Sequence, residues 1–284
     1  MKNWRLINHR AYDGAMNMAI DEAILEAHLA GVVPPTVRLY GFEPAAVTIG
    51  YAQKMPPKTV ERITNSGIDV VRRPTGGRAV LHMHELTYSF VGSSQRQNLG
   101  EPEASQPVDQ AVSESGFLQP SILGAYKQIC EGLIVALRRL GVETELGVSD
   151  SSYRQIQDCF LATTTADLHY QGKKMAGSAQ ARRSNAVLQH GSILLQQDQG
   201  IMETLLTGGD TTAISPRQRH ANLFDVLGRQ VSIEDLQRAV KYGFEQVFGC
   251  RLIECDLSKD EMARATEYRQ KFVVAEAKIS KSAV

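Results

Sequence analysis

Apolar positions along this chain recur with a helical period in some stretches and a strand period in others. From Ala15 to Ala30 they return every three or four residues, which predicts an amphipathic helix with Asp21 and Glu22 on another face. Two β-prone runs follow, Thr36–Tyr40 and Ala45–Gly50. The Gly-Phe-Glu-Pro segment between them is typical of a hairpin or a tight strand connection.

The same patterns predict the remaining elements. In chain order these are a helix from Pro57 to Gly67, a strand at Ile68–Val71, a strand of the same sheet at Leu86–Val91, a helix at Ser121–Leu140, three successive strands at Ala166–Gln171, Lys173–Ser178 and Ala186–Gln196, a helix capped by Ser232, and a charged helix from Ser258 to about Ala275. The stretch from Ser93 to Pro120 is rich in Ser, Gln, Gly and Pro without a period, so we expect a long surface loop or lid there.

Short strands mixed irregularly with helices favour an α+β fold with mixed, mostly antiparallel sheets over a doubly wound one. With 284 residues and 43% hydrophobic content the chain can bury a sizeable core, and both one large domain and two small ones fit this length. We expect one domain over residues 1–284. Its mainly helical C-terminal part, residues 200–284, is a candidate for a small appended lobe.

The charges of the chain balance, because Lys and Arg together number 31 and so do Asp and Glu. No overall field therefore favours a nucleic acid or a membrane surface as a partner. The N-terminus lacks the apolar core of a signal peptide, and no later stretch is apolar enough to span a bilayer. We expect a cytoplasmic protein that binds neither nucleic acid nor membrane.

The four cysteines, Cys130, Cys159, Cys250 and Cys255, show no Cys-x-x-Cys spacing, so neither a disulfide framework nor a metal site is predicted. Cys130 adjoins an apolar helix face, and Cys250 and Cys255 flank an apolar strand, which favours inert burial for these three. Cys159 differs because its surroundings are polar and loop-like. Any thiol chemistry is expected at that residue.

A nearby ammonium group would give Cys159 its chemistry. Asp158 next to it would raise the thiol pKa unless a cation such as Lys174 lies closer, so a nucleophile and an inert thiol both stay open. Strand alternation sends Lys173 and Lys174 to opposite faces, and Lys174 shares its parity with the small residues after it. A solvated charge at the strand start is the alternative for Lys174.

A second candidate site lies between Val70 and His82, where a buried strand runs into two arginines, a proline and a glycine pair. Adjacent glycines let a ligand approach the backbone N–H groups, and arginine adds a planar donor fork for anionic oxygens. The alternative is a strand, a turn and a strand with solvated arginines. The spacing is that of neither a Walker loop nor a dinucleotide-binding loop, so it implies no nucleotide.

A third candidate is the strand segment Gln189–Leu195, which polar groups interrupt at His190, Gly191 and Ser192. A histidine in a strand is either a base or a hydrogen-bonded structural residue, and we favour the structural role for His190.

Together these segments resemble the biotin and lipoate protein ligase superfamily, and within it the cysteine-dependent octanoyltransferases that attach octanoate to lipoyl domains. The matching segments are Asn17–Ala23, Arg38–Pro44, Gly50–Gln53, Arg72–Arg78, Gly172–Gln180 and Leu188–Leu194. They occur in the same order as in the family and extend over most of the chain.

The resemblance implies the fold of that superfamily's catalytic domain and a role for each site residue. Lys174 matches the family's active-site lysine, and Cys159, 15 positions upstream, matches the cysteine that carries the acyl group in the carrier-protein branch. The implied substrate-binding residues are Arg72, Arg73, Gly76, Gly77, Arg78, His82, Gly177, Ser178, Ala179, His190, Gly191 and Ser192. One departure is visible, because Met83 and His84 follow His82 where the family commonly has an aspartate.

The activity implied by the resemblance is transfer of an octanoyl group from octanoyl-acyl carrier protein to a lysine of lipoyl domains, through a thioester on Cys159. The implied partners are acyl carrier protein and lipoyl-domain proteins, namely the glycine cleavage H protein and the E2 subunits of 2-oxoacid dehydrogenases. No cofactor is implied beyond the phosphopantetheine of the carrier, and we expect a monomer. An ATP-dependent lipoate ligase, octanoyl transfer between lipoyl-domain proteins, and a non-catalytic carrier-binding module are the alternatives.

Overall fold

A computed structural model of the chain describes residues 1–94, 118–147, 167–196, 200–209 and 220–274. Most of the predicted loop from Ser93 to Pro120, Cys159, and the end of the predicted C-terminal helix lie outside the described residues. Within the described part, none of the helices combines the length and apolar content that crossing a membrane requires.

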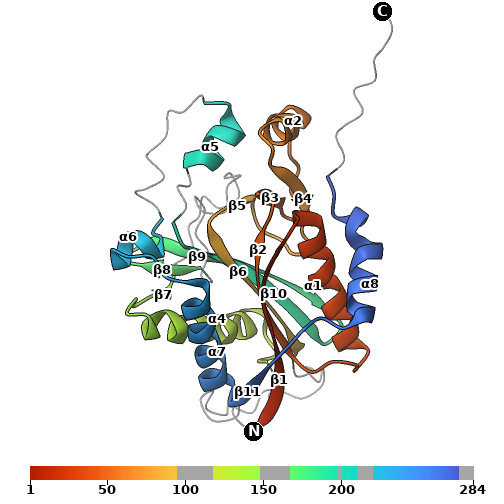
Figure 1. Ribbon diagram of the computed structural model, residues 1–284, viewed down its shortest axis with the longest axis vertical. Helices are drawn as coiled ribbons and strands as arrows, with labels where there is room; N and C mark the ends of the chain where they lie inside the picture. Colours follow the sequence, from red (N-terminus) through yellow and green to blue (C-terminus); the bar gives the residue numbers. More distant parts are fainter. Residues whose placement is uncertain (95–117, 148–166, 197–199, 210–219, 275–284) are drawn as a thin grey trace, which may run out of the picture.

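A large mixed sheet forms the centre of the molecule (Figure 1). Its strands are β1 (Lys2–Tyr12), β2 (Thr36–Phe42), β6 (Glu85–Ser93), β7 (Glu145–Leu146), β8 (Leu168–Tyr170), β9 (Lys173–Arg183), β10 (Ala186–Leu194) and β11 (Cys250–Cys255). They run in the order β11-β1-β2-β6-β10-β9-β8-β7, and only the pairs that β1 makes with β11 and β2 are parallel.

A second sheet of three strands holds β3 (Ala46–Ile49) between β4 (Asp69–Arg72) and β5 (Val80–His82). Of the two predicted alternatives for Gly-Phe-Glu-Pro, the hairpin is wrong and the tight strand connection is confirmed, because β2 belongs to the large sheet and β3 to the small one. The strand predicted at Leu86–Val91 likewise pairs with β2 and β10 and does not share the sheet of β4.

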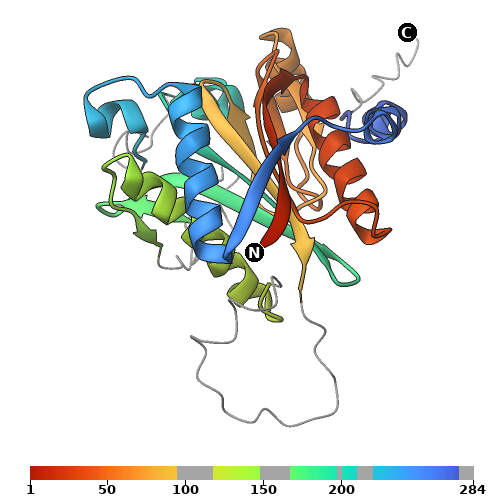
Figure 2. The ribbon, with the colours of Figure 1, turned by 60° about the horizontal axis from the view of Figure 1, so that its bottom comes forward.

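Helices cover both faces of the large sheet (Figure 2). The helices of the described residues are α1 (Gly14–Leu29), α2 (Pro57–Asn65), α4 (Ile122–Arg139), α5 (Gly200–Thr207), α6 (Leu223–Leu227), α7 (Ile233–Phe248) and α8 (Lys259–Tyr268), followed by a 3₁₀ turn at Arg269–Lys271. The main core lies between the sheet and α4 with α7, and a second core lies under α1 and α8. A third, smaller core joins the three-stranded sheet to α2 and α5.

The predicted α+β class is confirmed, and so are most of the predicted elements. The hairpin between β8 and β9 turns at Gln171 and Gly172, which both have positive φ, as the Gln-Gly pair predicted. The charged C-terminal helix is shorter than predicted and ends at Tyr268, because Phe272 turns into the core under α1.

The C-terminal third is built into the rest of the molecule. Strand β11 pairs in parallel with β1 at the edge of the large sheet, and α7 packs along α4. This packing contradicts the expectation of an appended lobe.

Candidate functional site

A small cavity lies where the large sheet, the small sheet and α1 meet, and its volume is about 30 Å³. The predicted site residues that line it are Arg73, His82, Gly177, Ser178, Ala179, His190, Gly191 and Ser192. Met18, Tyr40, Thr48, Val80 and Thr87 complete the lining. The cavity holds no more than about two water molecules, so an eight-carbon chain enters only if the walls move apart.

The glycine loop, residues 73–78, is held to the small sheet by its own arginines. Arg73 is buried and donates to the carbonyl oxygens of Thr48, Gly76 and Arg78 at 2.6 to 3.0 Å. Arg72 donates to three carbonyl oxygens of the neighbouring segment 50–53. These guanidinium groups fix the loop, and they are not presented to a ligand anion as the sequence predicted.

Glycine is required at the close approach between this loop and the segment after β3. Gly77 has a φ of +91°, and an added Cβ would lie 2.7 Å from Arg73 Nη2. A Cβ on Gly50 would lie 2.2 Å from the carbonyl oxygen of Gly77. These glycines admit the Arg73 side chain and the loop backbone, and the predicted approach of a ligand stays a prediction.

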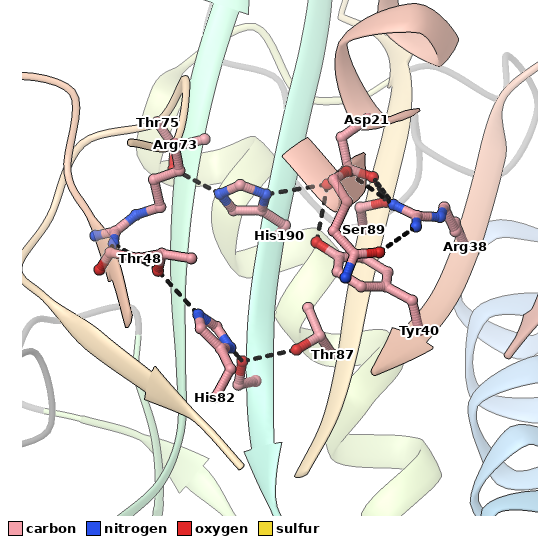
Figure 3. Close-up of polar contacts among 12 residues, drawn as sticks. Asp21, Arg38, Tyr40, Thr48, Arg73, Thr75, His82, Thr87, Ser89 and His190 are labelled. Atoms are coloured by element: carbon pink, nitrogen blue, oxygen red, sulfur yellow. Dashed lines mark hydrogen bonds and ion pairs between the residues drawn. The ribbon is translucent and has the colours of Figure 1, made fainter. Parts of the chain in front are cut away.

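A buried polar network lies beside the cavity, centred on Asp21 of α1 (Figure 3). The Asp21 carboxyl accepts from Arg38 at 2.7 Å, Tyr40 at 2.9 Å, Ser89 at 2.8 Å and His190 at 3.2 Å. Burial alone would raise the pKa of Asp21, but the charge of Arg38 and the hydrogen bond from His190 outweigh it and lower the pKa.

His190 joins this network to the glycine loop. The Asp21 carboxyl accepts a hydrogen bond, so Nδ1 carries the ring proton. Nε2 therefore accepts a hydrogen bond from the Thr75 hydroxyl, at 2.6 Å. Burial lowers the pKa of His190 despite the nearby Asp21, which favours this neutral form.

The order hydroxyl, imidazole, carboxyl is also that of a hydrolase triad. Thr75, however, is fully buried and is not among the residues that line the cavity. Its hydroxyl therefore ties the loop to β10, and His190 has the structural role that we favoured.

His82 also lines the cavity, and like His190 it has a hydrogen-bond partner at each ring nitrogen (Figure 3). Its Nδ1 lies 2.6 Å from Oε1 of Glu85, and its Nε2 lies 2.8 Å from Oγ1 of Thr48. Because Thr48 Oγ1 accepts from Arg73, its own proton is available to Nε2, so Nδ1 of a neutral His82 carries the ring proton. The ring of Phe42 stacks on His82 with the centroids 4.0 Å apart. Glu85 thus gives His82 a carboxyl partner although Met83 stands at the family's aspartate position.

Lys174 is buried, with 1% of its side chain exposed, and its Nζ lies 2.9 Å from Oδ2 of the equally buried Asp167. The predicted alternation is confirmed, because Lys173 is exposed while Lys174 is not. The alternative of a solvated charge is wrong for Lys174.

Lys174 does not line the cavity between the sheets. Cross-strand register places Gly177 opposite Ser192 and Ala179 opposite His190, so these four residues share one face of the sheet. Lys174 and Ser178 have the other parity. Ser178 still borders the cavity, but its hydroxyl forms a hydrogen bond with that of Tyr88 on the side facing α4.

The described cysteines fit the predicted burial in two of three cases. Cys130 and Cys250 are buried, which raises the pKa of both thiols, that of Cys250 to about 12. Cys255 is exposed, which contradicts its predicted burial, because the second half of β11 faces solvent at the sheet edge.

Several residues of the site were not predicted as such. They are Asp21, Arg38, Tyr40, Glu85 and Asp167. The helical period placed Asp21 away from the apolar face, but α1 is enclosed by the sheet and α8. The segments Asn17–Ala23 and Arg38–Pro44, which carry the family resemblance, contain the first three of these residues, and this was the only signal for them.

Comparison with known proteins relates nearly the whole chain to the family that the sequence motifs resemble. A family model described as the lipoyl protein ligase A/B catalytic domain matches residues 13–245. The octanoyltransferase LipM of Kyrpidia tusciae is 36% identical, and the match covers 97% of this chain and 98% of that protein. LipM of Brevibacillus brevis is 37% identical over 94% of this chain and 95% of its own.

Solved structures share the fold. The crystal structure of lipoate-protein ligase A bound with ATP superposes with a TM-score of 0.73 at 26% identity, covering 95% of each chain. The fold is thus that of lipoate-protein ligase A.

Proposed function

This chain belongs to the family of lipoyl protein ligase A/B catalytic domains, and we propose that it is an octanoyltransferase that moves an octanoyl group from acyl carrier protein to a lysine of lipoyl domains. The observation that carries the proposal is the similarity to octanoyltransferases over nearly the whole chain. Lipoyl-domain acceptors of the H-protein and E2 kinds, a cytoplasmic location and a monomeric state are parts of the same proposal.

The reaction has two steps in this proposal. The Cys159 thiolate attacks the carbonyl carbon of the carrier's thioester, a new C–S bond forms, and the phosphopantetheine thiolate leaves. The acceptor amine then attacks the thioester on Cys159, gives up a proton, and expels the Cys159 thiolate as the amide forms. Exchange of thioesters is nearly isoenergetic and amide formation is downhill, so the sequence of steps needs neither ATP nor another cofactor.

Lys174 is proposed to stabilise the anionic species of both steps. An ammonium group held in a buried ion pair keeps its position without reorganising, and in a low-dielectric site its charge acts more strongly than it would in water. Asp167 positions it, since its Oδ2 lies 2.9 Å from Nζ.

The cavity between the sheets is proposed to open for the acyl chain. Gly177 and Ala179 put no bulky side chain on the β9 part of its wall, and His190 is the large side chain that β10 contributes. Burial of the chain contributes about 0.8 kcal/mol per methylene, which offsets the cost of separating the walls. Arg72, Arg73 and Lys173 are the cations that the sequence offers to an acidic carrier protein. Arg72 and Arg73 donate to backbone carbonyl oxygens, so we propose exposed Lys173 for this contact.

An ATP-dependent lipoate ligase is the second candidate, because the ATP-bound ligase A shares the fold. Pure protein is mixed with octanoyl-acyl carrier protein and an apo lipoyl domain without ATP, and octanoylation of the domain is followed by mass. A rate of transfer without ATP that equals the rate with ATP supports the transferase. A strict requirement for free octanoate and ATP would assign the ligase activity.

A further inference from the structure

A second and larger cleft lies next to the cavity between the sheets. Its volume is about 340 Å³, within the range of small-molecule sites. It is formed by β1, β2, the turn between β5 and β6, the end of β10, and the segment from α6 to the start of α7. We call it the Glu85 cleft after the acidic residue in its wall.

Glu85 connects the two hollows. Its Oε1 accepts from Thr87 and lies 2.6 Å from Nδ1 of His82, both of which line the smaller cavity. Its Oε2 has no hydrogen-bond partner among the described residues, although only 6% of the residue is exposed. An ionised carboxyl group with an unpaired buried oxygen is costly, so a donor that the described residues do not supply would stabilise this atom.

The lining of the Glu85 cleft suits a cation on an aliphatic stem. None of the described residues that line it is Lys or Arg, so the described part of the chain places neither of these cationic side chains there. Phe42, Met83, Leu195 and Phe224 give it apolar walls against which methylene groups can pack.

A second carboxyl group acts on His9, which lines the cleft. Burial and the charge of Arg38 lower the pKa of His9, and Glu234, in the first turn of α7, offsets only part of this effect.

The cleft also adjoins the strand that carries Lys174. The backbone N–H of Ala221 donates to the carbonyl oxygen of Lys174, and that of Phe224 donates to the carbonyl oxygen of Leu195. Leu195 and Phe224 line the cleft, so one short segment connects its wall to the buried ion pair of Lys174.

We propose that the Glu85 cleft receives the acceptor lysine, with Glu85 Oε2 accepting a hydrogen bond from its ammonium group and the apolar walls covering its methylenes. This inference rests on the proposed function and specifies where its second substrate binds. The pantetheine arm of the carrier is the competing occupant, but its neutral amides would leave the charge of Glu85 unpaired.

The protonated form of n-butylamine reproduces the end of a lysine side chain and serves as the probe, with 1-butanol as its uncharged match. Butylammonium is expected to inhibit transfer competitively with the apo lipoyl domain and not with octanoyl-acyl carrier protein, while butanol has no effect at equal concentration. Glu85→Gln keeps the size of the side chain and is expected to weaken butylammonium binding, measured by calorimetry, about tenfold or more. Equal binding of the amine and the alcohol, or competition with the donor, would overturn the proposal.

Val231→Trp fills the cleft from its rim without touching the pair formed by His82 and Glu85, and Ile253→Trp is the matched control on the exposed face of β11. The first variant is expected to raise KM for the lipoyl domain about tenfold with a smaller change in KM for the carrier, and the control is expected to change neither. If the enzyme acquires its octanoyl adduct but the two variants behave alike, the cleft assignment fails. If no adduct forms, the proposed function fails instead.

Discussion

At the scale of single residues, the unusual feature is the ion pair of Lys174 and Asp167, because both charged side chains are buried. A lysine at a strand start is usually solvated. Only strand alternation and the family resemblance indicated that Lys174 faces the interior. Both partners are almost fully buried, so the chain commits two charges to one place in its interior. Such a pair is weak support for stability, and we have proposed that it serves to position the ammonium group.

Lys174→Met is expected to lower the free energy of unfolding by about 3 to 5 kcal/mol, because it leaves the Asp167 carboxyl buried without its counter-charge. The double variant Lys174→Met, Asp167→Leu is expected to recover most of this loss while staying inactive. Urea denaturation measures both, and Lys173→Met, at the exposed neighbour, is the control. Equal effects at the two lysines would contradict the buried pair.

Thr75→Val is expected to cost about 1 to 3 kcal/mol of stability, because Nε2 of His190 loses its donor inside the network. Thr75→Ser keeps the hydroxyl and should retain most of the stability. Thermal unfolding of the two variants compares them directly, and a serine variant no better than valine would remove the role given to this hydrogen bond.

At the scale of elements, the strand pair of β9 and β10 depends on small residues where the two backbones come close. A Cβ on Gly191 would lie 2.3 Å from Ser178 Oγ and 2.4 Å from the carbonyl oxygen of Gly177. The sequence showed these strands and their turn clearly, because alternation and a Gln-Gly pair are local signals. It did not show that β2 and β3 belong to different sheets, because a short connection looks the same whether it turns a hairpin or crosses between layers.

Gly191→Ala is expected to destabilise the protein by about 1 to 3 kcal/mol, since the neighbouring strand must shift to admit the methyl group. Gly76→Ala is the matched control, because an added Cβ there meets nothing within 4 Å. Melting temperatures of the two variants give the comparison. Similar melting temperatures would show that the wall of the cavity is less rigid than described.

At the scale of the whole molecule, the site is assembled from elements far apart in the sequence. The network around Asp21 draws on α1, β2, β6 and β10, and the cavity adds β3, β5 and β9. The α+β class and most elements could be predicted from periodicity. The partners of Asp21, Glu85 and Asp167 could not, because a single sequence carries no signal of which distant strands meet.

This assembly makes stability depend on pH in one direction. The pKa of His190 is lowered below the ordinary value of 6.5, mainly by burial, so the unfolded chain takes up a proton first as pH falls. His190 therefore contributes to stability above pH 6.5, and this contribution is lost on acidification. The lowered pKa of Asp21 makes stability fall in the same direction at lower pH. The free energy of unfolding should therefore fall between about pH 7.5 and pH 5.5, and less steeply in His190→Gln. A slope unchanged by that substitution would contradict the assignment.

The account depends most on the thioester that we propose to form at Cys159. Intact mass after mixing the pure protein with octanoyl-acyl carrier protein, in the absence of ATP and acceptor, measures that step alone. We predict one octanoyl group on the wild-type protein and on Cys255→Ser, which removes the exposed cysteine of β11, and none on Cys159→Ser. An unmodified wild-type protein, or an adduct that persists in Cys159→Ser, would contradict the mechanism.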